Sequence, residues 1–273
     1  MTRSFRITRL AGIDLSVHWT FLLLLGWIVL ASLTGGAAFA AYQLALVMAL
    51  FACVVLHELG HAMAARVFGI PTHGITLLPV GGVAQLDRIP RDPRQEWIIA
   101  LAGPAVNVVI VGILLPIALL IHSFTLGASF IGTEFLMRLV WMNVSLVVFN
   151  LIPAFPMDGG RLLRATLATR SDYVTATRTA KRVGQGVAAL LFVTGLLWNP
   201  MLMLVAGFVM LAAESEYQQV RFESQQPVAR PSESYPSRPA RPVILEAYRS
   251  QTGGHVGSWS LPTAGIVIHS SCE

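Results

Sequence analysis

Long apolar runs separated by short polar segments dominate residues 17–214. The clearest run extends from about residue 44 to residue 67, long enough for a helix to cross the ~30 Å hydrocarbon core of a bilayer. The last two runs are short and are parted by Trp198-Asn199-Pro200, which indicates a helical hairpin. Six runs emerge in this way: 17–33, 44–67, 97–121, 135–151, 183–197 and 201–213. The pattern predicts a polytopic α-helical membrane protein with about six transmembrane helices.

Two segments break the helical pattern. Residues 12–18 alternate in a strand-like way just before the first apolar run. Residues 74–86 contain two β-rich halves around Pro79-Val80-Gly81-Gly82 and are too short and too interrupted for a spanning helix. We expect a hairpin or a re-entrant loop there. Such backbone is tolerated at membrane depth only where protein or a cavity covers it, so small membrane-associated strands are predicted.

Composition and charge support this class and indicate an orientation. Hydrophobic residues make up 55% of the chain, charged residues 12%, and the mean hydropathy is +0.65. The net charge of +5 would suggest nucleic acid as a partner of a soluble protein, but the basic residues here flank apolar runs, so no nucleic-acid partner is expected. The Arg-rich segments 1–9, 88–94 and 161–182 share one side if six spans alternate. The positive-inside rule therefore predicts a multi-pass protein of the cell (inner or plasma) membrane with both termini cytoplasmic.

The same features divide the chain into three parts. Residues 1–16 form an N-terminal cytoplasmic segment that supplies an edge strand, and residues 17–214 form the membrane-embedded core. Residues 215–273 are rich in proline, serine and arginine, which is typical of a largely flexible, extended tail.

The chemistry is concentrated in His57-Glu58-x-x-His61, inside the apolar run 44–67. Two histidines four positions apart on a helix lie on the same face, as two ligands of one zinc ion require. Glu58 is next to the first histidine, where it can accept a proton from a water molecule at the metal. Buried ionisable groups are costly in a membrane, so three of them within five positions indicate a functional site. The alternative is a pair of histidines satisfied by hydrogen bonds within a helical bundle.

A hydrolytic zinc site needs a third protein ligand and an open position. Asp158 is the best candidate by position, because it follows a span that returns to the side on which the zinc helix ends. Pro153 and Pro156 end that span, and the following Gly-Gly pair permits close packing. Asp158 is equally well suited to cap the next helix, and the residues alone leave both roles open. The other candidates in apolar territory are Asp14, His18, His73 and Glu134.

Three linked motifs resemble the site-2 proteases, a family of intramembrane zinc metalloproteases, over roughly residues 10–215. They are His57-Glu58-x-x-His61, Gly103-Pro104-x-x-Asn107, and Asn150-x-x-Pro153-x-x-x-x-Asp158-Gly159. The strand-like segments are similar to the edge strands of the sporulation-factor-like branch of that family. The proline-rich tail is too short for the CBS pair that many members of this branch carry.

The resemblance implies a zinc metalloendopeptidase that hydrolyses peptide bonds within or near transmembrane segments of its substrates. It implies one zinc ion per chain, held by His57, His61 and Asp158, with Glu58 as general base. It also implies that Asn150 hydrogen-bonds the substrate backbone.

Two further substrate contacts are hypotheses from the residues. Asn107 is a second polar candidate near the site, although an interhelical hydrogen bond explains it equally well. Gly81 and Gly82 belong to an expected edge strand that could hold an unwound substrate segment by β-augmentation.

The expected partners are a single-span membrane protein as substrate and the lipid bilayer, and the sequence leaves a homo-oligomer open. Two rival functions are a non-catalytic relative that binds membrane helices and a metal transporter. The intact glutamate argues against the first, and the absence of internal sequence repeats argues against the second.

Overall fold

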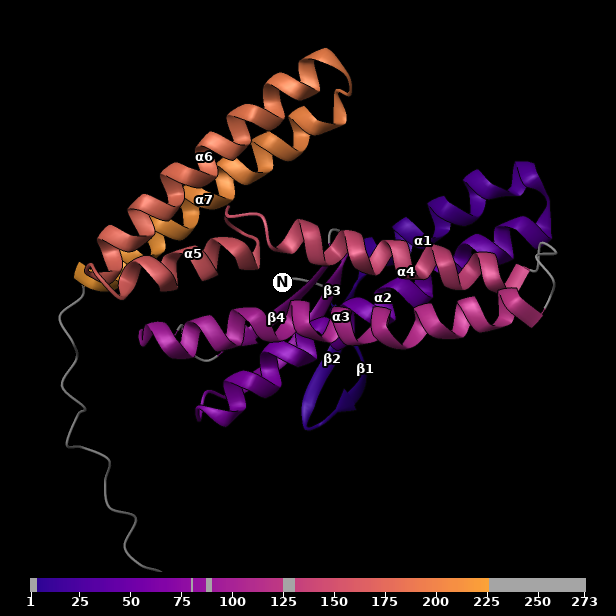
Figure 1. Cartoon of the computed structure of the whole chain (residues 1–273), viewed down its shortest axis with the longest axis horizontal. Coiled ribbons are helices and arrows are strands. Elements are labelled where there is room, and N and C mark those ends of the chain that lie inside the picture. The colour runs from indigo at the N-terminus through magenta and orange to yellow at the C-terminus, as the bar shows by residue number, and fades with distance from the viewer. Residues whose placement is uncertain (1–3, 80, 87–89, 125–130, 226–273) are drawn as a thin grey trace, which may run out of the picture. The chain divides into compact units, whose positions relative to one another are not determined.

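A computed structural model describes residues 4–79, 81–86, 90–124 and 131–225 (Figure 1). The predicted tail therefore lies outside the described residues from position 226 onward. The helices are α1 (Trp19–Ser32), α2 (Ala37–Val67), α3 (Pro93–Phe124), α4 (Ile131–Asn150), α5 (Asp158–Ala168), α6 (Tyr173–Leu197) and α7 (Met201–Gln225). The strands are β1 (Ser4–Leu10), β2 (Ile13–His18), β3 (Thr72–Leu78) and β4 (Gly81–Leu86), and a short 3-10 helix covers Leu33–Gly35.

The strands form one sheet in the order β1-β2-β3-β4. β1 and β2 are an antiparallel hairpin whose turn residues Ala11 and Gly12 have φ of 50° and 85°, values that suit a two-residue hairpin turn. β2 and β3 are parallel, and the chain makes α1 and α2 between them. β3 and β4 are antiparallel and confirm the hairpin predicted for residues 74–86. In the described chain, β4 is an edge strand, paired only with β3.

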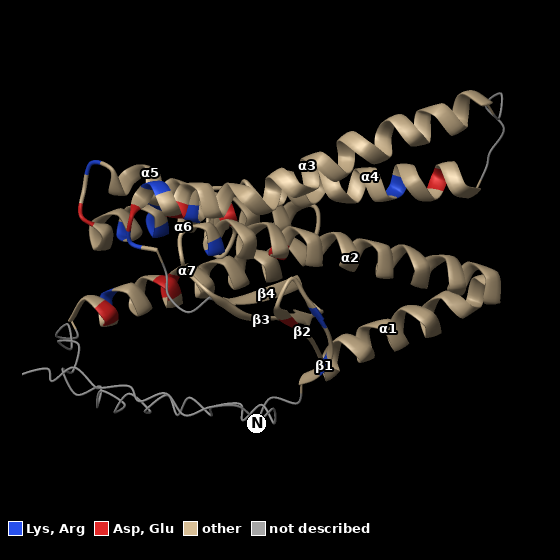
Figure 2. Ribbon diagram, turned by 90° about the horizontal axis from the view of Figure 1, so that it is seen from below, with Lys and Arg blue, Asp and Glu red and all other residues tan. Residues whose placement is uncertain are grey.

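Four described helices, α2, α3, α4 and α6, are long and apolar enough to cross a membrane. The predicted count of about six spans is not confirmed. α1 has 14 residues, because the first apolar residues of its run belong to β2 and the last belong to the 3-10 helix. α7 has 25 residues, but its second half is polar and it does not reach the hydropathy of a span. Charged residues gather in α5 and the neighbouring parts of α6 and α7, whereas α1 has none (Figure 2).

α3 is the helix against which the site is assembled, because it packs against α2, α4 and α5. Close packing with α2 depends on Gly60, where an added Cβ would lie 2.8 Å from the backbone oxygen of Ala102. A separate cluster of buried apolar residues joins the sheet to α1 and α2, formed by Val17, Phe21, Phe51, Val55 and Leu77. The sheet is thereby fixed beside the part of α2 that carries the histidine motif.

Candidate active site

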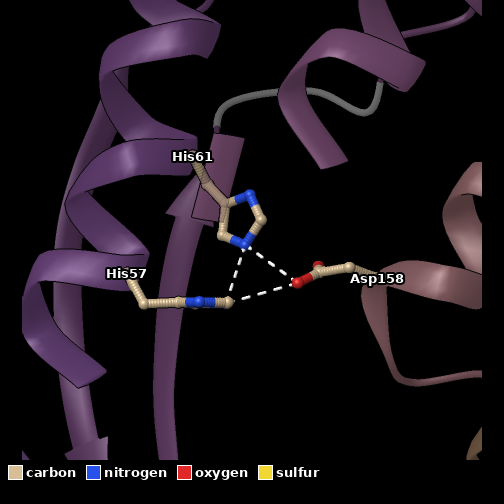
Figure 3. Close-up of side chains that lie close together, drawn as sticks. All are labelled: His57, His61 and Asp158. Carbon is tan, nitrogen blue, oxygen red and sulfur yellow. Dashed lines mark hydrogen bonds and ion pairs between the residues drawn. The ribbon is translucent and has the colours of Figure 1, made fainter. Parts of the chain in front are cut away.

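Three buried side chains from two helices converge on one point (Figure 3). α2 supplies His57 and His61, whose Nε2 atoms are 3.1 Å apart. α5 supplies Asp158, whose Oδ2 lies 3.2 Å from each of these nitrogens. The three ligand atoms therefore form a nearly equilateral triangle of nitrogen, nitrogen and oxygen.

The triangle has the dimensions of a zinc site. Tetrahedral coordination with bonds of ~2.0–2.1 Å places neighbouring ligand atoms ~3.3 Å apart, close to the separations observed. Among the described residues, His57, His61 and Asp158 form the group that could hold a metal ion. They are positioned to bind one metal ion.

Hydrogen bonds on the far sides of the two imidazoles direct their Nε2 lone pairs into the site. His61 donates through Nδ1 to the carbonyl oxygen of Ile99 at 2.7 Å, and His57 Nδ1 lies 2.8 Å from Asn107 Oδ1. A carbonyl oxygen can only accept, so the Nε2 of a neutral His61 carries a lone pair. The third atom, Asp158 Oδ2, is buried and has no hydrogen-bond partner. Three mutually facing acceptors are unfavourable unless a cation binds between them, so the donor set fits a metal ion.

Asp158 is the first residue of α5 and does not cap it. The N-cap residue is Met157, and no side chain makes a capping hydrogen bond there. A Cβ at Gly159 would collide with the carbonyl oxygens of Leu151 and Ile152, which explains the glycine after the ligand.

α3 supplies no ligand but forms one wall of the site at Gly103. A Cβ added at Gly103 would lie 2.7 Å from His57 Nε2 and would also collide with His61 Nε2. Ile99, Gly103 and Asn107 follow one another at intervals of four residues and so share one face of α3. The sequence motif that contains Gly103 and Asn107 is therefore part of the metal site.

Glu58 packs against the sheet at β4. A Cβ added at Gly82 would lie 2.6 Å from Glu58 Cγ, so the backbone of β4 passes directly beside this side chain. Gly81 and Gly82 begin β4. The predicted substrate-binding glycines and the predicted general base are thus neighbours.

The polar candidates Asn107 and Asn150 occupy different environments. Asn107 is fully buried and uses its amide for His57 and for Asn143 on α4, which is the interhelical hydrogen bond considered as the alternative for it. Asn150 is the last residue of α4, at the start of the loop that leads to Asp158. The substrate contacts of both residues stay predictions. The remaining candidate ligands lie outside the metal-binding group: Asp14 and His18 on β2, His73 on β3 and Glu134 on α4.

A buried ion cluster joins α5 to α3 and α7. Arg164 is 1% exposed, and it donates through Nε to Glu96 Oε1 at 2.7 Å and through Nη1 to Glu216 Oε1 at 2.6 Å. Its guanidinium carbon lies 5.0 Å from the ring centroids of both Phe155 and Tyr173. Burial alone would lower the pKa of Arg164, but the charge of Glu96 raises it above its ordinary value.

This cluster, together with Ile99 and Asn143, was not found from the sequence. Ile99 takes part through its main-chain carbonyl oxygen, which any residue would supply, so nothing in the sequence points to it. Glu96 in the first turn of an apolar helix and Arg164 in a short amphipathic helix were the visible hints.

Comparison with known proteins agrees with this geometry. The model of peptidase family M50 matches residues 45–134 and 128–194, more than half of the chain and all three ligands. The chain belongs to peptidase family M50. A zinc metalloprotease of Methanocaldococcus jannaschii is 40% identical over 225 residues, which are 82% of this chain and 63% of that relative.

A solved structure shows the same fold. The site-2 protease from Methanocaldococcus jannaschii has a TM-score of 0.57 and 39% identity, covering 78% of this chain and 95% of the solved chain. The chain spans about half to two thirds of the length of the curated relatives it matches. The M50 fold and a metal site of zinc type are thus established by family and geometry together.

Proposed function

We propose that this M50 protein is an intramembrane zinc metalloendopeptidase that hydrolyses peptide bonds within or near transmembrane segments of single-span membrane proteins. The observation that supports it most is the triangle of His57, His61 and Asp158, buried on helices of a membrane protein with Glu58 beside it. When bound there, zinc would lower the pKa of a coordinated water molecule toward ~7 and polarise the scissile carbonyl.

Glu58 acts as the general base. Its carboxylate lies close enough to His57, His61 and Asp158 to interact electrostatically with all three, and from there it accepts a proton from water and then donates it to the leaving amine. The ligands are 4–6% exposed, so bulk water is largely excluded and a single water molecule can be oriented for attack.

The edge strand β4 receives the substrate. A helical substrate hides its carbonyls in hydrogen bonds and must unwind before it is cut, and an unwound segment can pair with an exposed strand edge. Gly82 has no side chain, so a paired segment can approach Glu58 closely. Asn150, the last residue of α4, is proposed to hydrogen-bond the substrate backbone.

The proposed setting is the cell membrane, with both termini in the cytoplasm. Arg66 in the last turn of α2 marks the cytoplasmic end of that helix, so the metal site lies nearer the cytoplasmic face. The proposed organisation retains a membrane core over residues 17–214.

The test is cleavage of a panel of single-span substrates by detergent-solubilised protein, comparing the wild type with Glu58→Gln and measuring zinc in both. We expect about one zinc per chain in each and a 10²–10⁴-fold loss of cleavage in the variant, because the amide cannot accept the proton. An active Glu58→Gln protein would refute the role of the base. Zinc in both without cleavage by either would favour a binding-only relative, and zinc uptake into vesicles would favour a transporter.

A further inference from the structure

A chain of buried hydrogen bonds runs from the candidate ligand His57 through α3 to α4. Asn143 donates through Nδ2 to the carbonyl oxygen of Leu139 at 2.8 Å. Asn107 donates through Nδ2 to Asn143 Oδ1 at 3.0 Å, and Asn107 Oδ1 lies 2.8 Å from His57 Nδ1. Asn107 and Asn143 are both 0% exposed, so no bulk water competes for these groups.

The carbonyl oxygen of Leu139 fixes the orientation of both asparagine amides in this series of hydrogen bonds. The Leu139 carbonyl can only accept, so the nitrogen of the Asn143 amide must face it and the oxygen of that amide must face Asn107. Asn107 must then present its nitrogen to Asn143 and its oxygen to His57. An oxygen at this position requires a proton on His57 Nδ1, which leaves the lone pair of Nε2 directed at Asp158 and His61.

We propose that Asn143, whose hydrogen bonds go to Asn107 and Leu139 and which is not in the metal-binding group, is a positioning residue of the metal site. It sets the orientation of the Asn107 amide and thereby the tautomer of His57 in which Nε2 can bind a metal. This proposal rests on the proposed role of His57 as a zinc ligand. If Asn143 is absent, the Asn107 amide loses the partner that orients it and can rotate by half a turn. The nitrogen of a rotated amide faces Nδ1, the imidazole proton moves to Nε2, and that nitrogen can no longer bind.

A purely structural role makes a different prediction. Asparagine side chains between membrane helices also act as simple interhelical hydrogen bonds. In that case any residue that fails to bridge α4 and α3 would weaken packing, and a buried charge at position 143 would be as harmful as an apolar side chain or worse. Orientation instead requires only an acceptor facing Asn107, which an aspartate provides and a leucine of similar size does not.

The experiment measures the zinc dissociation constant of the full-length protein in detergent by competition with a chelator, together with the absorption spectrum of the cobalt-loaded protein. We expect Asn143→Leu to weaken zinc binding by about 10-fold or more and to change the cobalt spectrum. We expect Asn143→Asp to bind zinc within a few-fold of wild type. The matched control is Ser145→Ala on the same helix, whose hydroxyl donates to the Trp141 carbonyl at 2.8 Å on the exposed face and should have no effect.

Each outcome decides the matter. Wild-type affinity in Asn143→Leu, or an equal loss in Asn143→Asp and Asn143→Leu, would overturn the proposal. If Asn143→Leu does not fold, Asn143→Ser replaces it, because a serine hydroxyl can bond the Leu139 carbonyl but is too short to direct Asn107. Absence of zinc from the wild type would instead refute the proposed function itself, so the two failures are distinguishable.

Discussion

A single added methyl group at Gly103 should weaken metal binding. In Gly103→Ala the new Cβ would lie 2.7 Å from His57 Nε2, and an ordinary contact begins near 3.4 Å, so the ring must shift by about 0.7 Å or the helices must separate by a similar amount. Ligand sets tolerate displacements of only about 0.5 Å. His61 Nε2 is obstructed by the same carbon, so moving one ring does not relieve the overlap.

The magnitude follows from the cost of overpacking. Extra methylenes in a filled core typically cost about 1–3 kcal/mol, which corresponds to about 5- to 150-fold in an equilibrium constant. Since the obstructed atoms are the ligand atoms themselves, we expect most of this cost to appear as weaker zinc binding. Any remainder should appear as a lower thermal transition of the metal-free protein.

Both quantities should be measured on the detergent-solubilised protein, by chelator competition and by thermal unfolding. Gly112→Ala is the matched control, because Gly112 lies on the same helix and a Cβ there meets nothing within 4 Å. That control should bind zinc normally and gain up to about 1 kcal/mol from helix propensity. The steric reasoning would be refuted if Gly103→Ala bound zinc as tightly as Gly112→Ala and unfolded at the same temperature.

Two further substitutions test the surroundings of the site. In Gly82→Ala the Cβ would lie 2.6 Å from Glu58 Cγ, so we expect the turnover number to fall by up to about 100-fold at unchanged zinc content, and unchanged turnover would contradict the placement of β4 beside the base. Arg164→Met leaves Glu96 buried without its partner and should lower the free energy of unfolding by about 3–5 kcal/mol with faster loss of zinc to a chelator. Lys181→Met breaks a more exposed ion pair between α6 and α7 and should cost at most about 1 kcal/mol, so equal losses in the two variants would argue against a special role for the buried cluster.

The periodicity of the sequence was sufficient to predict those structural features that depend only on residues close together along the chain. The four-residue spacing of His57 and His61 predicted two ligands on one face of a helix, and the structure brings their Nε2 atoms together. The alternation in residues 12–18 and the interrupted segment 74–86 predicted the strands that became β2, β3 and β4. The number of spans was harder to predict, because the first apolar run is shared between β2, α1 and a 3-10 turn.

Long-range contacts could not be derived from the residues alone. Asp158 suited a helix cap as well as a ligand, and only the position of α5 against α3 and α2 decides between these roles. Arg164 and Glu96 are 68 positions apart, and no pattern along the chain pairs them. Asn143 lies in a largely apolar run, and its hydrogen-bond partner depends on which helix packs opposite.

The structure assigns the organising role to α3, a helix without a metal ligand. Glu96, Ile99, Gly103 and Asn107 are spaced by three, four and four residues, so they form one stripe along the helix. Glu96 binds Arg164 of α5, and Gly103 leaves room for the Nε2 atoms of both histidines. The carbonyl oxygen of Ile99 accepts a hydrogen bond from His61, and the amide oxygen of Asn107 accepts one from His57. Polar groups inside a membrane protein are tolerated when they are paired, and the partners of this stripe include both imidazoles of the site and Arg164 on α5, the helix that carries the third ligand. A rotation of α3 about its axis would therefore disturb all three ligands together, whereas a change on α2 or α5 disturbs only the ligands that those helices carry.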